Sequence, residues 1–149
     1  MTNNSPPRVV KHRGLSLLEL TVVITTILSL IALLFVGTRG WLRGSDRSCC
    51  VMTIRNVQLA ARSYQNLYGY NYGGRPYAEG GTQDIAVHLR TKGYIEDAVY
   101  DQASGASKCK GSGTYSCPRP DIFPEQGELY MTCSLAGPEN HQPKNSLDW

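Results

Sequence analysis

The hydrophobic residues are concentrated near the start of the chain. A polar segment, residues 1–14, precedes the 22 residues Leu15–Val36, among which Glu19 carries the only charge. At about 1.5 Å per residue, a helix of this length covers the roughly 30 Å hydrocarbon core of a bilayer. It is longer than the apolar part of a secretory signal peptide, about 7–15 residues, and no A-x-A-like site follows it closely. We therefore predict a membrane-spanning helix here.

A second apolar pattern has the period of an amphipathic helix. Between Asp46 and Tyr68, apolar residues recur at spacings of 3, 4, 3 and 4, namely Ile54, Val57, Ala61, Tyr64 and Tyr68. Gly69 follows as a stop signal. We predict one long helix over residues 15–68. Three glycines lie between its two patterns, Gly37, Gly40 and Gly44. They form either a plain linker or a helix weakened by about 1 kcal/mol per glycine.

The rest of the chain predicts a small mixed region. Thr82 can cap a short helix over residues 83–91, which Gly93 ends. Alternating β-prone residues predict an antiparallel hairpin of residues 113–117 and 128–134. Because an isolated hairpin is marginal, we expect it to pack on the long helix. The fold class is then α+β, with a small C-terminal antiparallel sheet. The chain then divides into a polar N-terminal segment (residues 1–14), a membrane-spanning helix (15–36), the distal half of the long helix (37–68) and a small α+β region (69–149).

The net charge belongs mostly to the first segment. The chain has 15 Lys and Arg against 12 Asp and Glu, a net charge of +3, and three of the basic residues precede Leu15. A chain beginning at Leu15 would carry 15 − 3 = 12 basic and 12 acidic residues, for a net charge of zero. We therefore expect no nucleic-acid partner.

Glu19 requires an explanation, because a carboxylate in an apolar helix costs about 2.5–3.5 kcal/mol at mid-bilayer and less near the interface. One interpretation is a plain anchor in which Glu19 reaches the lipid headgroups. The other pairs the carboxylate with a cation. If the chain is cleaved between Gly14 and Leu15, the new α-amino group lies four residues from Glu19, one helical turn away. The amino group of a neighbouring subunit could play the same part.

The residues around Gly14 resemble a known processing site. The string RGLSLLELTVV, residues 13–23, resembles the prepilin peptidase site of type IV pilins and type II secretion pseudopilins. The resemblance implies cleavage after Gly14, N-methylation of Leu15 and an essential role of Glu19 in assembly. Leu15 departs from the family, which most often has Phe there. The string SDRSCCVMTIRNVQLAARSYQNLYG, residues 45–69, also resembles the second half of the pseudopilin helix.

The resemblance implies a structural subunit of a type II secretion-like pseudopilus, and not an enzyme. Its partners would be copies of itself, other pseudopilins or minor pilins, prepilin peptidase, the inner-membrane assembly platform and the lipid bilayer. It would cross the bacterial inner membrane once, with the C-terminal region in the periplasm, and could extend into a periplasmic or extracellular fibre. The glycine segment would unwind when subunits pack. The alternatives are a type IV pilus subunit for adhesion, motility or DNA uptake, and a membrane-anchored periplasmic binding module.

Five cysteines, an odd number, leave at least one thiol without an intrachain disulfide partner. With a hairpin centred near Phe123, Cys133 would lie opposite Gly113, close to Cys109. We therefore favour a disulfide between Cys109 and Cys133 over one between Cys117 and Cys133. Such a bond would contribute about 3 kcal/mol. We interpret the adjacent Cys49 and Cys50 as small buried apolar residues.

Two metal sites compete with these interpretations. A zinc set of three cysteines and a histidine lacks the short C-x₂₋₄-C spacing of structural zinc sites and is disfavoured; its members would be Cys109, Cys117, Cys133 and His141. Three acidic residues of the hairpin loop, Asp121, Glu125 and Glu128, could bind calcium, and major pseudopilins bind calcium in this part of the chain. A solvated loop remains the simpler interpretation. No cofactor is otherwise expected, and no nucleophile motif, phosphate loop or paired catalytic set is present in the sequence.

Overall fold

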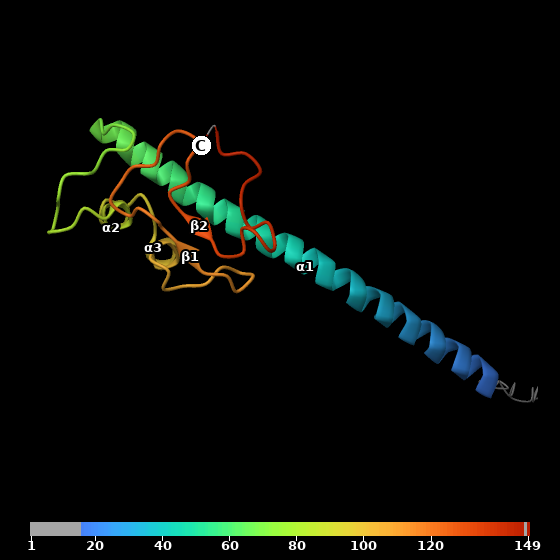
Figure 1. Cartoon of the computed structure of the whole chain (residues 1–149). Coiled ribbons are helices and arrows are strands. Elements are labelled where there is room, and N and C mark those ends of the chain that lie inside the picture. Colours follow the sequence, from blue (N-terminus) through green and yellow to red (C-terminus); the bar gives the residue numbers. More distant parts are fainter. Residues whose placement is uncertain (1–15, 148) are drawn as a thin grey trace, which may run out of the picture. The chain divides into compact units, whose positions relative to one another are not determined.

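The computed structural model describes residues 16–147 and 149. Its elements are, in chain order, α1 (Leu17–Tyr68), α2 (Ile85–Thr91), α3 (Asp97–Ala103), β1 (Tyr115–Ser116) and β2 (Thr132–Cys133). The fold is α+β, as predicted: a long N-terminal helix packs against a small antiparallel sheet of two strands (Figure 1). The chain forms two compact units that divide between Arg39 and Gly40, within the glycine-rich segment.

The long helix α1 runs close to the predicted bounds. The segment with Gly37, Gly40 and Gly44 is helical, so it is not an irregular linker. The helix ends at Tyr68, and the next residue, Gly69, has a left-handed φ of 70°. Two backbone hydrogen bonds close this end, from Gly69 N to Asn66 O at 3.4 Å and from Tyr70 N to Gln65 O at 2.9 Å. These two bonds form a Schellman motif, in which glycine is preferred because it adopts the left-handed conformation without strain.

The two short helices differ from the prediction in one way each. Helix α2 begins at Ile85, two residues later than expected, because the Asp84 carboxylate accepts hydrogen bonds from Ala86 N at 2.8 Å and Val87 N at 3.4 Å. Thr82 instead accepts a hydrogen bond from Asp84 N at 3.1 Å. Helix α3 was not predicted.

The hairpin is shorter than predicted and has a different register. Tyr115 pairs with Cys133 and Ser116 with Thr132, so the predicted pairing of Cys133 with Gly113 is wrong by two residues. Pro118 follows closely after β1, and proline cannot donate a hydrogen bond to a neighbouring strand. The regular ladder is therefore confined to two residues on each strand.

The core of the second unit lies along the distal half of α1. Four residues of the predicted apolar stripe are buried, Ile54, Val57, Ala61 and Tyr64, whereas Tyr68 is 47% exposed. The Tyr64 ring contacts the ring of Phe123 with a centroid distance of 5.8 Å. Cys50 is fully buried in this core, but Cys49 is exposed, so only one of the two adjacent cysteines was interpreted correctly. Successive residues of a helix point about 100° apart, which separates these two side chains.

Candidate functional site

The first candidate site is the apolar part of α1 in the first unit. It is long and apolar enough to cross a membrane, and none of its most apolar 18-residue window is buried. Its large side chains are exposed, for example Leu18 at 72% and Leu33 at 69%. An apolar surface of this extent is unfavourable in water, so it indicates contact with lipid or with other protein chains.

The threonine side chains of this part of the helix are satisfied within the helix. Thr21 Oγ1 donates a hydrogen bond to Leu18 O at 2.8 Å, and Thr26 Oγ1 donates one to Val23 O at 2.8 Å. Thr25 Oγ1 bonds the carbonyl oxygens of Thr21 and Val22 in the same way, at 3.0 and 2.9 Å. Because these hydroxyls need no water, the threonines are compatible with a lipid environment.

Glu19 lies in the first turn of α1 and is exposed. A carboxylate in this position interacts favourably with the partial positive charge of a helix N-terminus. The predicted cleavage site and methylated residue, Gly14 and Leu15, lie outside the described residues, so their geometry relative to Glu19 stays a prediction.

The second candidate site is a cluster of four buried side chains in the second unit. Cys50, Cys109, Cys133 and His141 place their Sγ and ring nitrogen atoms within 4.8 Å of one another. Cys109 Sγ lies 3.8 Å from Cys133 Sγ and 3.7 Å from His141 Nδ1. The structure therefore brings together three of the four residues considered for zinc from the sequence and replaces Cys117 with Cys50.

Four separate parts of the fold hold this cluster. Cys50 comes from α1 and Cys133 from β2, while Cys109 and His141 come from loops. The Cys109 loop is a tight turn, in which Ser112 N donates to Cys109 O at 2.8 Å and Cys109 N donates to Gly113 O at 2.8 Å. The His141 loop is held by a hydrogen bond from His141 N to Leu135 O at 3.1 Å.

Cys117 lies apart from the cluster. It is half-buried, and its thiol donates a hydrogen bond to Ala103 O at 3.4 Å. Burial raises the pKa of the Cys117 thiol to about 12, and it raises the pKa of the Cys50 thiol to about 12 as well. Both groups are neutral thiols at physiological pH unless a cation lies beside them. The five cysteines are unbonded in this structure, and the disulfide connectivity stays a prediction.

Sequence reasoning missed Cys50 because its partners lie at least 59 residues further along the chain. A usable signal was present in the glycines of the Cys109 loop. A Cβ at Gly111 would lie 2.7 Å from His141 Cε1, and one at Gly113 would lie 3.0 Å from Cys133 Sγ. Both positions require glycine because the backbone approaches the cluster closely.

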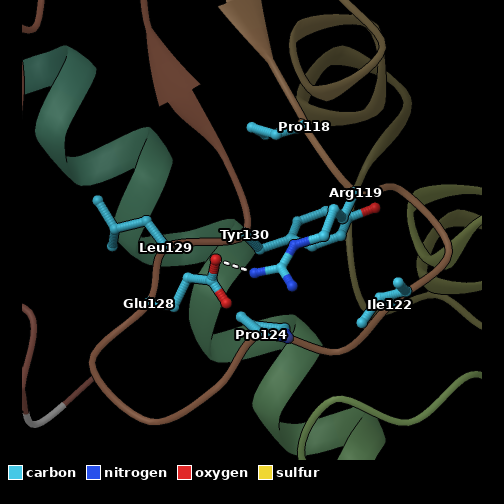
Figure 2. A pocket seen from close by; sticks show the side chains of 7 residues that line it. All are labelled: Pro118, Arg119, Ile122, Pro124, Glu128, Leu129 and Tyr130. Atoms are coloured by element: carbon cyan, nitrogen blue, oxygen red, sulfur yellow. Dashed lines mark hydrogen bonds and ion pairs between the residues drawn. The ribbon is translucent and has the colours of Figure 1, made fainter.

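Two of the three carboxylates considered for calcium, those of Asp121 and Glu128, form ion pairs with arginines. Figure 2 shows Glu128 paired with Arg119 beside a small pocket, and the second carboxylate oxygen of Glu128 accepts a hydrogen bond from Glu125 N at 3.2 Å. Asp121 forms an ion pair with Arg75 at 3.3 Å. Calcium binding here stays a prediction and would have to replace these contacts.

The pocket in Figure 2 has a volume of about 20 Å³ and includes Tyr130 in its lining. Such a volume holds about one water molecule. It is far smaller than the roughly 300–1,000 Å³ of typical sites for small organic ligands. A second pocket, which includes Tyr115, Cys117 and Tyr130 in its lining, has a volume of about 370 Å³.

The two candidate sites differ in kind: one is an apolar helix surface and the other a buried thiol and imidazole cluster. Comparison of the chain with models of protein families, with curated proteins and with solved structures gives no match.

Proposed function

We propose that this protein is a structural subunit of a pilin-like fibre, most specifically a pseudopilin of a type II secretion-like system. The observation that carries the proposal is the exposed apolar surface of α1 in the first unit, which includes Glu19 in its first turn. A long apolar helix followed by a small α+β region is compatible with a pilin-like fold.

The apolar surface suits two environments in turn. Before assembly, the helix would lie in the inner membrane, where lipid covers its leucine, isoleucine and valine side chains. After assembly, the same side chains would pack against the helices of neighbouring subunits. Since lipid and apolar side chains solvate this surface similarly, the transfer between them needs a polar interaction to set its direction and register.

Glu19 supplies that interaction in the proposed mechanism. Cleavage after Gly14 creates an α-amino group at Leu15, and this cation pairs with Glu19 of the same or a neighbouring chain. A carboxylate and an ammonium group are each unfavourable in an apolar environment, and pairing stabilises both. The pair therefore favours one axial position of each subunit relative to the next.

The glycine segment fits the same proposal. Added Cβ atoms at Gly37, Gly40 and Gly44 would meet no atom within 4 Å, so these glycines are not needed for packing in the single chain. Their effect is to lower helix stability by about 1 kcal/mol each. We infer that they let α1 unwind locally when subunits pack in the fibre.

Intact-mass spectrometry of the chain, purified from its native membrane, tests the proposal. The expected product lacks Met1–Gly14 and carries one added methyl group on its new amino terminus. Deleting the prepilin peptidase should leave the full-length, unmethylated chain and abolish fibres. A chain that keeps its first fourteen residues in cells with active peptidase would contradict the proposal and favour a plain membrane anchor.

Electron microscopy then separates the two fibre types. Long extracellular fibres containing this chain at natural expression would indicate a type IV pilus subunit. Loss of protein secretion on deletion of the gene, without such fibres, would support a pseudopilin.

A further inference from the structure

The cluster of Cys50, Cys109, Cys133 and His141 is not needed for membrane insertion or for pairing of Glu19. It converges from four chain segments, and its members are between 0% and 5% exposed. Buried single cysteines are common as small apolar residues. Three thiols and an imidazole that all face one point are the donor set of a metal site.

Two distances in the cluster match those of a tetrahedral centre, and all its donor atoms lie within 4.8 Å of one another. Zinc binds thiolate sulfur at about 2.3 Å and imidazole nitrogen at about 2.0–2.1 Å. At tetrahedral angles, these bond lengths separate two sulfur ligands by about 3.8 Å and a sulfur from a nitrogen by about 3.6 Å. The observed separations are 3.8 Å between the sulfurs of Cys109 and Cys133, and 3.7 Å between Cys109 Sγ and His141 Nδ1.

The surroundings of His141 support the same assignment. Its Nδ1 faces the sulfur of Cys109, while its Nε2 lies 3.6 Å from the Glu139 carboxylate. A metal-bound histidine commonly directs its second ring nitrogen to a carboxylate, which fixes the orientation of the ring. Glu139 is thus placed to orient the ligand without binding the metal itself.

A disulfide accounts for less of this geometry. A bond between Cys109 and Cys133 would use two of the four groups and leave the Cys50 thiol and the His141 imidazole buried beside it. The close backbone approach at Gly111 concerns His141, not the two cysteines of such a bond. A metal uses all four groups at once.

We propose that Cys50, Cys109, Cys133 and His141 bind one zinc ion in a tetrahedral, structural site. All four positions are filled by protein, so no coordination position is open for a substrate. The ion would join α1 to β2 and to the loops that carry Cys109 and His141. A small region with a thin apolar core gains stability from such a link.

Metal analysis of the full-length chain, purified in detergent without a metal-affinity tag, tests the proposal. The expected content is about one zinc per chain. Cys133→Ser and His141→Asn should each lower the content at least about tenfold, as expected when a ligand is lost. Cys49→Ser and Cys117→Ser are the matched controls, because these cysteines lie outside the cluster, and both variants should keep the zinc.

A measurement on the unaltered sequence covers the case in which a ligand variant fails to fold. Cobalt(II) in place of zinc should give the intense visible bands of a tetrahedral site together with thiolate-to-metal charge-transfer absorption. Weak octahedral bands would overturn the proposal. So would a metal-free protein in which peptide mapping finds a bond between Cys109 and Cys133, or equal zinc content in Cys133→Ser and the unaltered chain.

Discussion

Gln58 on α1 bonds the backbone on both sides of Leu129, at Glu128 and at Tyr130. The side-chain oxygen of Gln58 accepts a hydrogen bond from Tyr130 N at 2.8 Å, and its nitrogen donates one to Glu128 O at 3.0 Å. Gln58 is 1% exposed, so no water competes for these groups. The amide acts as a short strand partner and attaches the segment before β2 to the helix.

Replacing Gln58 with methionine, which has a similar length, should therefore destabilise the second unit. Two backbone groups would lose their hydrogen-bond partners. Each group that becomes buried and unsatisfied lowers the free energy of unfolding by about 1–3 kcal/mol. We expect a loss of about 2–4 kcal/mol in the free energy of unfolding, measured by denaturant titration of the detergent-solubilised chain. The control is the exposed Asn56 on the same helix. Asn56→Ala should change the stability by less than about 0.5 kcal/mol, and an equally small effect of Gln58→Met would refute the prediction.

Gly113 should not tolerate a side chain. A Cβ there would lie 2.8 Å from Leu135 Cγ and 3.0 Å from Cys133 Sγ, closer than ordinary packing permits. Gly113→Ala should lower the free energy of unfolding by about 1–3 kcal/mol through overpacking. Gly137→Ala is the matched control, because a Cβ at Gly137 would meet no atom within 4 Å. Thermal unfolding of both variants checks the difference, and equal midpoints would contradict it.

The pair of Glu79 and Lys92 should make stability depend on pH. Lys92 Nζ lies 2.7 Å from Glu79 Oε2, and this hydrogen bond lowers the pKa of the Glu79 carboxyl. A carboxyl with a lowered folded-state pKa stabilises the protein above its ordinary pKa of 4.5, and the contribution is lost as the pH falls through the folded-state value. The pair is partly exposed, so the effect should be small and should weaken with salt.

Comparison of the unaltered chain with Glu79→Gln checks this dependence. The difference between their melting temperatures should be largest near neutral pH and should shrink below the ordinary carboxyl pKa of 4.5. Glu96 is a suitable control, since its side chain makes no capping hydrogen bond to α3. If the difference in melting temperature between Glu79→Gln and the unaltered chain stays constant over this pH range, the ion pair contributes nothing to the pH dependence of stability.

The sequence predicts the elements whose cause is local. The long helix follows from its periodicity and from Gly69, and α2 follows from its capping signals. The hairpin register and α3 depend on packing between distant segments, which no local pattern contains. The cluster shows the same limit, because Cys50 looks like any apolar helix residue until the fold places it beside Cys109. The zinc set considered from the sequence therefore contained Cys117 in place of Cys50, and the structure places Cys117 outside the cluster.

Glu19 allows the assembly mechanism to be separated from membrane insertion. Glu19→Gln keeps the shape of the side chain but removes its charge, so the proposed pairing with the Leu15 amino group is lost. Insertion should be unchanged or more favourable, because an uncharged residue is less costly in lipid. We expect normal amounts of processed protein in the membrane but at least a tenfold loss of sheared fibres, since about 1.4 kcal/mol corresponds to a factor of ten and a paired charge in lipid contributes at least that much.

Two further variants make the Glu19 result specific. Glu19→Asp keeps the carboxylate and should restore part of the assembly, whereas Thr26→Leu changes a neighbouring polar residue of the same helix and should assemble normally. The Thr26 hydroxyl donates to Val23 O of its own helix at 2.8 Å, so it is already satisfied within the chain. Because Thr26→Leu also makes the helix more apolar, it controls for the change in hydrophobicity that accompanies Glu19→Gln. Equal fibre yields from Glu19→Gln and Thr26→Leu would mean that the charge of Glu19 does not direct assembly.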